Sequence, residues 1–146
     1  MALQQIATHL EGAEVYYGAA ICKKKSLELL DECLLPKGLL PLTDLVEVGR
    51  NRTTGFVWLK QQKSLEYRFK AIGKTVSYES EVTAFVEDRR MRRLTGVKTK
   101  EMLIWVTVSD ISVDHSNPSK ISFANPTGLS RSFPVSAFEA EEEERK

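Results

Sequence analysis

The sequence has no run of apolar residues long enough to cross a bilayer, which takes about 18 or more in an unbroken stretch. Its N-terminus also lacks the basic stretch and apolar core of a secretory signal. The chain has 2 cysteines, Cys22 and Cys33, and both fall in one candidate helix. Helical rise separates their Cα atoms by roughly 16 Å, whereas a disulfide needs under about 7 Å. We therefore expect free, buried thiols and a cytoplasmic location.

Charge of one sign is also missing, because the formal net charge is +1. A nearly neutral chain does not attract nucleic acid through its overall charge, so no nucleic-acid partner is expected. No CxxC pair occurs, His9 and His115 stand alone, and glycine-rich phosphate loops are absent. The sequence therefore predicts neither a metal site nor a cofactor.

The first half contains one helical pattern, over residues 19–34. Ile21, Leu27, Leu30 and Leu34 mark its expected apolar face, and Pro36 is expected to stop it. The pattern divides the chain into an N-terminal segment that is partly helical (1–18), one domain (19–138) and an acidic, flexible tail (139–146).

From residue 45 onward the apolar period becomes two, which is typical of strands. A first hairpin is expected over 45–48 and 56–59, followed by strands over 65–71 and 75–87. Residues 101–113 are apolar on both faces, so we expect them to form a central strand that is covered on each side. The fold class predicted is mainly β: a curled antiparallel sheet, a two-sheet sandwich or a barrel-like form, with one N-terminal helix.

Aromatic residues spread over these strands are the best candidates for a ligand site. A curled sheet with two apolar faces either buries the second face or encloses something, and small-molecule sites are mostly apolar concavities. An ordinary core is the simpler interpretation. The candidate ligand-binding residues are Trp58, Tyr67, Phe69, Tyr78, Trp105 and Phe123.

Two further candidates come from polar residues. Residues 128–132 resemble a nucleophile elbow without its second glycine, and Ser130 or Ser132 with His115 is the best serine–histidine set. No residue is assigned as catalytic on this basis. A basic hairpin tip suggests a surface contact, against the simpler interpretation of a solvated turn. The tip consists of Arg89, Arg90, Arg92 and Arg93.

Several motifs in fixed order resemble the plant Domain of Unknown Function 538 family, over about residues 21–138. The main ones are Glu47-Val48-Gly49, Thr54-Gly55-Phe56-Val57-Trp58-Leu59-Lys60, Leu94-Thr95-Gly96-Val97-Lys98-Thr99-Lys100 and Pro126-Thr127-Gly128-Leu129-Ser130-Arg131-Ser132-Phe133-Pro134. The likeness is strongest to the branch without a signal peptide. It implies an all-β, barrel-like or two-sheet core with an N-terminal helix. It also implies lipid binding, chlorophyll binding or ester hydrolysis, without agreed catalytic residues.

The leading hypothesis is a non-catalytic intracellular plant protein that binds a lipid-like or other apolar ligand and is linked to stress or growth responses. One alternative is a weak esterase acting on chlorophyll or a similar ester. Another is a protein-interaction or regulatory module. The expected partners are accordingly an apolar small molecule or lipid, or a protein, with no transmembrane segment.

Overall fold

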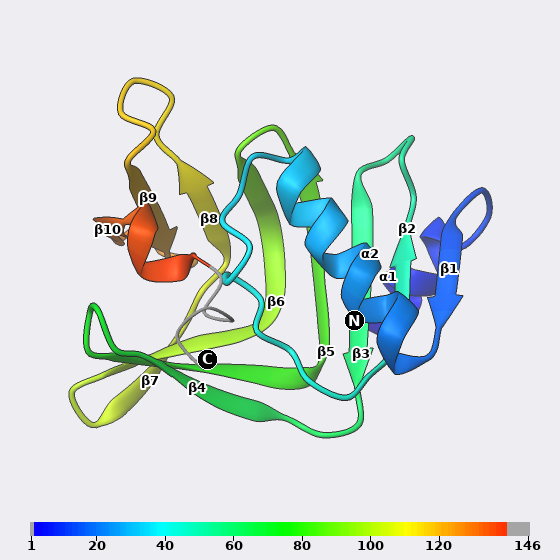
Figure 1. Ribbon diagram of the computed structural model, residues 1–146, viewed down its shortest axis with the longest axis horizontal. Helices are drawn as coiled ribbons and strands as arrows, with labels where there is room; N and C mark the ends of the chain where they lie inside the picture. Colours follow the sequence, from blue (N-terminus) through cyan, green and yellow to red (C-terminus); the bar gives the residue numbers. More distant parts are fainter. Residues whose placement is uncertain (1, 140–146) are drawn as a thin grey trace.

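The computed structural model describes the backbone of residues 2–139 and the side chains of residues 5–139. Except for Glu139, the expected acidic tail lies outside these residues. One antiparallel sheet makes up most of the fold, and a helix lies across one of its faces (Figure 1). No helix in the described part of the chain is long and apolar enough to cross a membrane.

The helices and strands follow one another with short connections, apart from the segment between α2 and β2. Their order is α1 (Ala2–His9), β1 (Glu14–Tyr17), α2 (Ala19–Glu32), β2 (Leu45–Arg50), β3 (Phe56–Gln61), β4 (Leu65–Phe69), β5 (Lys74–Glu87), β6 (Arg90–Glu101), β7 (Ile104–Thr107), β8 (Asp110–Val113), β9 (Lys120–Ala124), β10 (Ser130–Pro134) and the 3₁₀ helix η1 (Val135–Phe138).

The ten strands form one sheet in the order β1-β2-β3-β5-β6-β8-β9-β10, in which β4 also pairs with β5 and β7 also pairs with β6. The prediction of a mainly β, antiparallel fold with an N-terminal helix is confirmed. The expected closure is not found, because the sheet ends at β1 and β10, is neither a barrel nor strongly curled, and has no second sheet to form a sandwich. The sheet branches because β5 and β6, which pair with each other, are each long enough to pair with two further strands.

The long strands β5 and β6 change direction near their middles. Their register shifts between Tyr78 and Thr83, and Gly96 has a φ of 83°. A Cβ on Gly96 would collide with the backbone oxygen of Glu81, so this position requires glycine. As a result, one end of the β5–β6 pair continues into β4 and β7, and the other end into β3 and β8 (Figure 1).

The helix α2 forms where the sequence predicts it, and its buried face matches the expected one in part. Leu30 is buried as expected and Leu27 is half-buried, whereas Ile21 and Leu34 are exposed. The rest of the buried face consists of Cys22, Ser26 and Leu29, so the face is turned toward residues that the apolar spacing did not mark. Both cysteines are free and buried, as expected, and burial raises the pKa of each thiol above its ordinary value.

The end of α2 is set by a left-handed residue and not by Pro36. Leu34 has a φ of 58°. The Leu35 N–H donates to the Leu30 carbonyl at 2.8 Å, and the Leu34 N–H donates to the Asp31 carbonyl at 3.1 Å. This pair of hydrogen bonds is the Schellman motif, in which glycine is the favoured left-handed residue.

Replacing Leu34 by glycine should therefore raise the free energy of unfolding by about 0.5–1 kcal/mol, because a leucine held in the left-handed region is strained by about 1 kcal/mol. Urea denaturation would measure the change. Leu10 is the matched control, since it is equally exposed (52% against 54%) and has no positive φ. Leu10→Gly should give no gain, and equal responses of the two variants would contradict the explanation.

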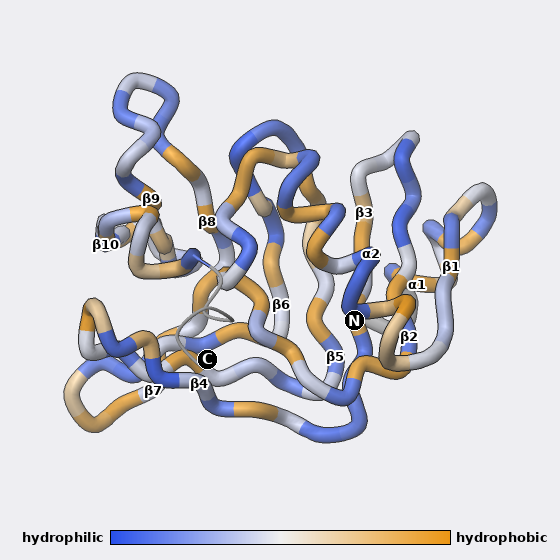
Figure 2. The backbone as a smooth tube through the Cα atoms, in the orientation of Figure 1, coloured by the Kyte–Doolittle hydropathy of each residue, from blue (hydrophilic) through white to orange (hydrophobic). Residues whose placement is uncertain are grey.

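The core lies between α2, the connector to β2 and the sheet. The connector contributes four buried leucines, and Tyr78 donates its hydroxyl to the Leu39 carbonyl at 2.8 Å. Figure 2 shows hydrophobic stretches along the connector, α2 and the neighbouring strands. Ile6, Phe56 and Trp58 form a smaller cluster, so the first residues also pack on the sheet through α1 and β1. The buried leucines of the connector are Leu35, Leu39, Leu40 and Leu42.

Candidate functional site

The expected central strand over residues 101–113 is in fact two short strands preceded by a turn. Met102 and Leu103 form the two-residue turn between β6 and β7, and β7 pairs only with β6. Trp105, expected at the centre, is 38% exposed. The predicted single strand is wrong because the chain turns at Met102 and Leu103, although neither is a usual turn residue. Met102 reaches the turn conformation with a positive φ of 57°.

A groove of about 700 Å³ opens beside this hairpin. One wall is formed by the end of β6, the turn and β7, and the other by the β9–β10 hairpin. Its volume is within the usual range for small-molecule sites. The residues that line it are Thr99, Glu101, Met102, Leu103, Ile104, Val106, Thr107, Val108, Phe123, Ala124, Asn125, Leu129, Ser130, Arg131 and Phe133.

The two walls diverge where the chain passes from β7 to β8. The Val108 N–H donates to the Val97 carbonyl on β6, and the next residue, Ser109, donates to the Ala124 carbonyl on β9, each at 2.9 Å. The chain therefore keeps β6 on one side and gains β9 on the other within one residue. Because β9 pairs with β8 and not with β7, the space between β7 and β9 is left without a strand.

An ion pair and a side-chain turn hold the rim of the groove. Glu101 accepts from Lys74 at 2.7 Å and lies 3.3 Å from Arg131, which joins the two walls. On the β9–β10 turn, Asn125 Oδ1 accepts from the backbone N–H groups of Thr127 and Leu129, each at 3.0 Å. This Asx-type turn leaves Leu129 73% exposed at the rim.

Of the six aromatic residues predicted to bind a ligand, only Phe123 lines this groove. Trp58 and Tyr78 are fully buried, and each donates a hydrogen bond, to Glu47 Oε2 at 2.7 Å and to the Leu39 carbonyl. Burial raises the pKa of Tyr78 well above its ordinary value, which keeps the phenol a donor.

The remaining three lie elsewhere. Phe69 is buried against Phe138, with ring centroids 4.7 Å apart, and Tyr67 packs beside it. Together these two line a smaller hollow near the connector, of about 210 Å³. Trp105 lies on β7 outside the groove lining. A role in ligand binding stays a prediction for all of them.

Several groove residues were not singled out from the sequence. Phe133 meets Phe123 edge-on at 5.6 Å between ring centroids, and it forms the floor with Val106 and Val108. Both are apolar residues inside strands, Phe133 on β10 and Val106 on β7, which by itself marks neither as part of a site. They line one groove because β9 joins the sheet beside β8 and not beside β7, and no local pattern in the sequence reports that pairing.

The serine–histidine set is not assembled. Within the described residues, His115 donates no hydrogen bond to Ser130 or Ser132, and Ser132 Oγ lies 2.8 Å from Ser122 Oγ. Ser130 pairs with Ala124, four residues along β9 from Lys120, where the loop carrying His115 ends. Four residues of strand place Ser130 roughly 13 Å from Lys120 along the sheet. The esterase hypothesis stays a prediction without a catalytic arrangement to support it.

The neighbouring acid does not orient His115 either. Asp114 accepts from the Ser116 hydroxyl at 2.8 Å and from the Ser116 N–H at 2.9 Å. These hydrogen bonds hold the pKa of Asp114 below its ordinary value. Asp114 therefore closes a local turn.

The arginine tip is largely paired with acids. Arg90 forms a two-pronged contact with Asp110 (2.6 and 3.1 Å), Arg92 donates to Glu87 at 2.8 Å and Arg89 to Asp88 at 2.9 Å. The guanidinium of Arg93 lies 5.9 Å from the ring of Phe85. The tip therefore presents less net positive charge than its sequence suggests, and a role as a protein contact surface stays a prediction.

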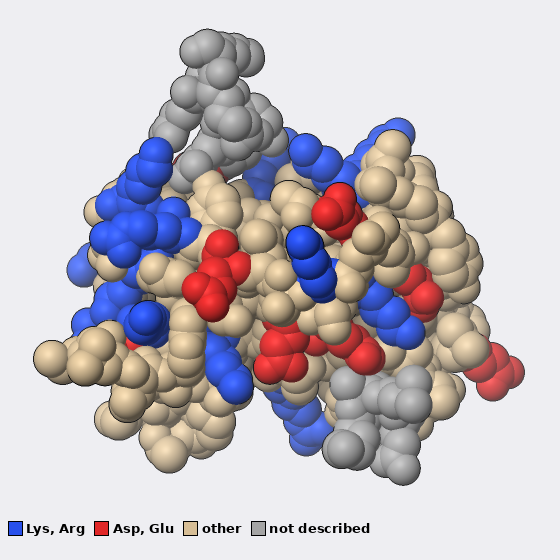
Figure 3. All heavy atoms as spheres, turned by 90° about the horizontal axis from the view of Figure 1, so that it is seen from below, with Lys and Arg blue, Asp and Glu red and all other residues tan. Residues whose placement is uncertain are grey.

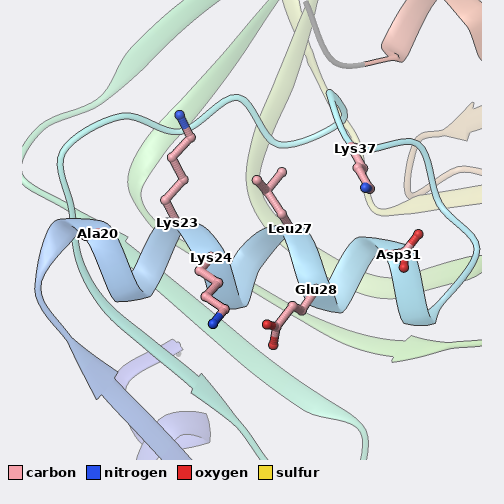
Figure 4. Close-up of a pocket in the computed structure, with 7 residues that line it drawn as sticks. All are labelled: Ala20, Lys23, Lys24, Leu27, Glu28, Asp31 and Lys37. Carbon is pink, nitrogen blue, oxygen red and sulfur yellow. The ribbon is translucent and has the colours of Figure 1, made fainter. Parts of the chain in front are cut away.

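A second hollow, of about 390 Å³, lies along α2 next to Lys37. Figure 4 shows Lys23 and Leu27 on the connector side of the helix and Lys24 and Glu28 on the other side. These side chains do not converge on a common point. The hollow therefore offers no arrangement that would hold one ligand.

Comparison with known proteins agrees with the motifs in the sequence. A family model described as "Protein of unknown function, DUF538" matches residues 26–139, which include the second half of α2, the sheet from β2 onward and the whole groove. No curated protein and no solved structure matches the chain. Because the match covers well over half of the chain, this protein is a member of the DUF538 family.

Proposed function

We propose that the protein is a non-catalytic binder of an apolar, lipid-like ligand, which it holds in the groove between the β6–β7 and β9–β10 hairpins. The observation that carries the proposal is the groove itself: about 700 Å³ of space in the sheet, with a floor of valine and phenylalanine side chains. Sites for small molecules typically combine such an apolar floor with a few polar groups.

The rim suggests which part of the ligand is polar. Arg131 is 63% exposed at its side chain and shares Glu101 with Lys74, so its guanidinium can also meet an anionic headgroup. Arginine binds carboxylates and phosphates through two parallel hydrogen bonds. An apolar chain with an acidic end, such as a fatty acid, fits both features.

The test is binding of cis-parinaric acid, a fluorescent fatty acid, together with native mass spectrometry of gently purified protein. The wild-type protein should take up the probe with a rise in fluorescence. Val106→Arg places a charge on the groove floor, and burying a charge without a partner is strongly unfavourable. This variant should bind the probe roughly tenfold more weakly or worse.

Val46→Arg is the matched control, because Val46 is an exposed valine on β2 and does not line the groove. It should bind as the wild type does. A wild-type protein that is always empty and takes up no probe would refute the proposal. Equal affinity of Val106→Arg and the wild type would remove the groove as the site.

A further inference from the structure

The turn between β6 and β7, at the edge of the groove, carries apolar side chains that are largely exposed. Met102 is 92% exposed, Leu103 91% and Ile104 65%, and Leu129 on the neighbouring turn is 73% exposed. Figure 2 shows this hairpin end as a hydrophobic stretch at the margin of the molecule. Single exposed apolar residues are ordinary, but a contiguous group at a projecting tip marks an interaction surface.

The backbone conformation of the turn is unusual for the residues that form it. Glu101 pairs with Ile104, so Met102 and Leu103 are the two central residues of a tight hairpin turn. Met102 has a φ of 57°, a conformation for which glycine is strongly preferred at this position. The fold by itself would favour glycine. A strained, fully exposed methionine therefore points to a role outside the fold.

Basic residues outnumber acidic ones in the segments next to the apolar turn. Residues 66–74, 98–105 and 129–131 contain six basic and two acidic residues, although the whole chain has a net charge of only +1. Figure 3 shows Lys and Arg gathered on the side of the molecule that carries the β4–β5 and β6–β7 turns in Figure 1. The six basic residues are Arg68, Lys70, Lys74, Lys98, Lys100 and Arg131.

Strand pairing places part of this charge next to Trp105. Lys100 pairs with Trp105 across β6 and β7, and its Nζ lies 5.7 Å from the indole ring. Lys98, two residues earlier, shares that face of the sheet. Tryptophan beside lysine, next to an exposed apolar tip, is the combination found where proteins meet the interface of a bilayer.

We propose that the β6–β7 turn docks on the surface of a membrane that contains anionic lipids. Met102, Leu103 and Ile104 enter the boundary between headgroups and acyl chains, while Lys98 and Lys100 face lipid phosphates. A second copy of this chain fits less well, because two such ends would bring like charges together. Docking by the turn does not require a ligand in the groove.

Vesicles of phosphatidylcholine mixed with phosphatidylserine provide the test, with pure phosphatidylcholine vesicles for comparison. The double variant Met102→Gly/Leu103→Ser should bind the mixed vesicles at least tenfold more weakly, since burying one such apolar side chain corresponds to about tenfold or more in affinity. Glycine suits the φ of residue 102, so a folding defect does not account for the loss. Unchanged binding would overturn the proposal.

Charge is tested separately with Lys98→Gln/Lys100→Gln. This variant should lose roughly tenfold or more in affinity for the mixed vesicles, because each lysine near an anionic surface corresponds to about fivefold. Binding to the pure phosphatidylcholine vesicles should hardly change. Trp105 reports docking directly: its emission should shift to shorter wavelength on the mixed vesicles, whereas Trp58 is fully buried throughout.

Three controls separate this proposal from its alternatives. Leu10→Ser/Tyr17→Ser removes two apolar side chains that are 52% and 68% exposed near β1, and it should bind vesicles as the wild type does. Val106→Arg should keep vesicle binding while it loses the fatty-acid probe; an equal loss of vesicle binding would assign the effect to the groove. Self-association without lipid that disappears in the Met102→Gly/Leu103→Ser variant would identify a second copy as the partner and overturn the membrane assignment.

Discussion

Replacing Gly49 by alanine is expected to lower the free energy of unfolding by about 3 kcal/mol or more, which is at or above the usual upper range for overpacking a core. Gly49 on β2 pairs directly with Trp58 on β3, and the indole lies flat across the missing side chain. A Cβ at position 49 would fall well inside contact distance of three atoms of the benzo ring.

The indole has no room to move away. Trp58 is fully buried, contacts Phe56 in the small core cluster and donates its Nε1–H to Glu47 Oε2 at 2.7 Å. Relief of the collision would therefore break this hydrogen bond or separate β2 from β3. Thermal unfolding should show the loss as a fall in Tm of about 10 °C.

A double-mutant cycle checks the cause. Trp58→Leu alone should cost about 3 kcal/mol, because it leaves a cavity. When Trp58 is already leucine, Gly49→Ala should cost little or nothing more, since the colliding ring is gone. Additive losses would show that the alanine acts through something other than the indole.

Replacing Phe138 by alanine should lower the free energy of unfolding by about 3–5 kcal/mol, as expected when a fully buried aromatic ring is removed. Phe138 is 0% exposed, and its ring lies 4.7 Å from that of Phe69 and 5.2 Å from that of Phe123. The ring thus joins β4 to β9 through η1. Urea denaturation followed by far-UV circular dichroism would measure the loss.

The same substitution should also change the shape of the groove floor. Phe123 forms part of its floor and packs against Phe138 from behind, so a cavity there leaves Phe123 free to turn inward. Phe138→Leu is the control, because it keeps most of the volume and should cost under about 2 kcal/mol. A cost of about 1 kcal/mol or less for Phe138→Ala would contradict a central role for this ring.

The period of two was enough to predict most strands correctly. The first hairpin corresponds to β2 and β3, and the expected strands over 65–71 and 75–87 correspond to β4 and β5. Alternation works here because each strand has one face on the core. In β4, for example, Phe69 is buried while Arg68 is exposed.

The sequence predicts the wrong structure where the residue types are unusual for the backbone conformation they adopt. Met102 and Leu103 are apolar and fit the strand predicted over 101–113, yet they form a turn without glycine, asparagine or aspartate. The predicted helix face is only partly right, because Cys22 and Ser26 lie in the buried face together with Leu29 and Leu30. The groove could not be predicted, because it depends on β9 pairing with β8 and not with β7.

The order of the strands in the sheet has a consequence for how the chain folds. Of the nine strand pairs in the described part of the chain, seven join consecutive strands and two, β3–β5 and β6–β8, skip one strand, so most pairings close a short loop. Short loops lose little chain entropy when they close, and the sheet can grow outward from the β5–β6 hairpin. One contact that joins distant parts of the chain is the hydrogen bond from the Gly38 N–H to the Phe138 carbonyl, at 2.7 Å. We therefore expect the packing of η1 on the connector to be among the last steps of folding, after the two walls of the groove have formed.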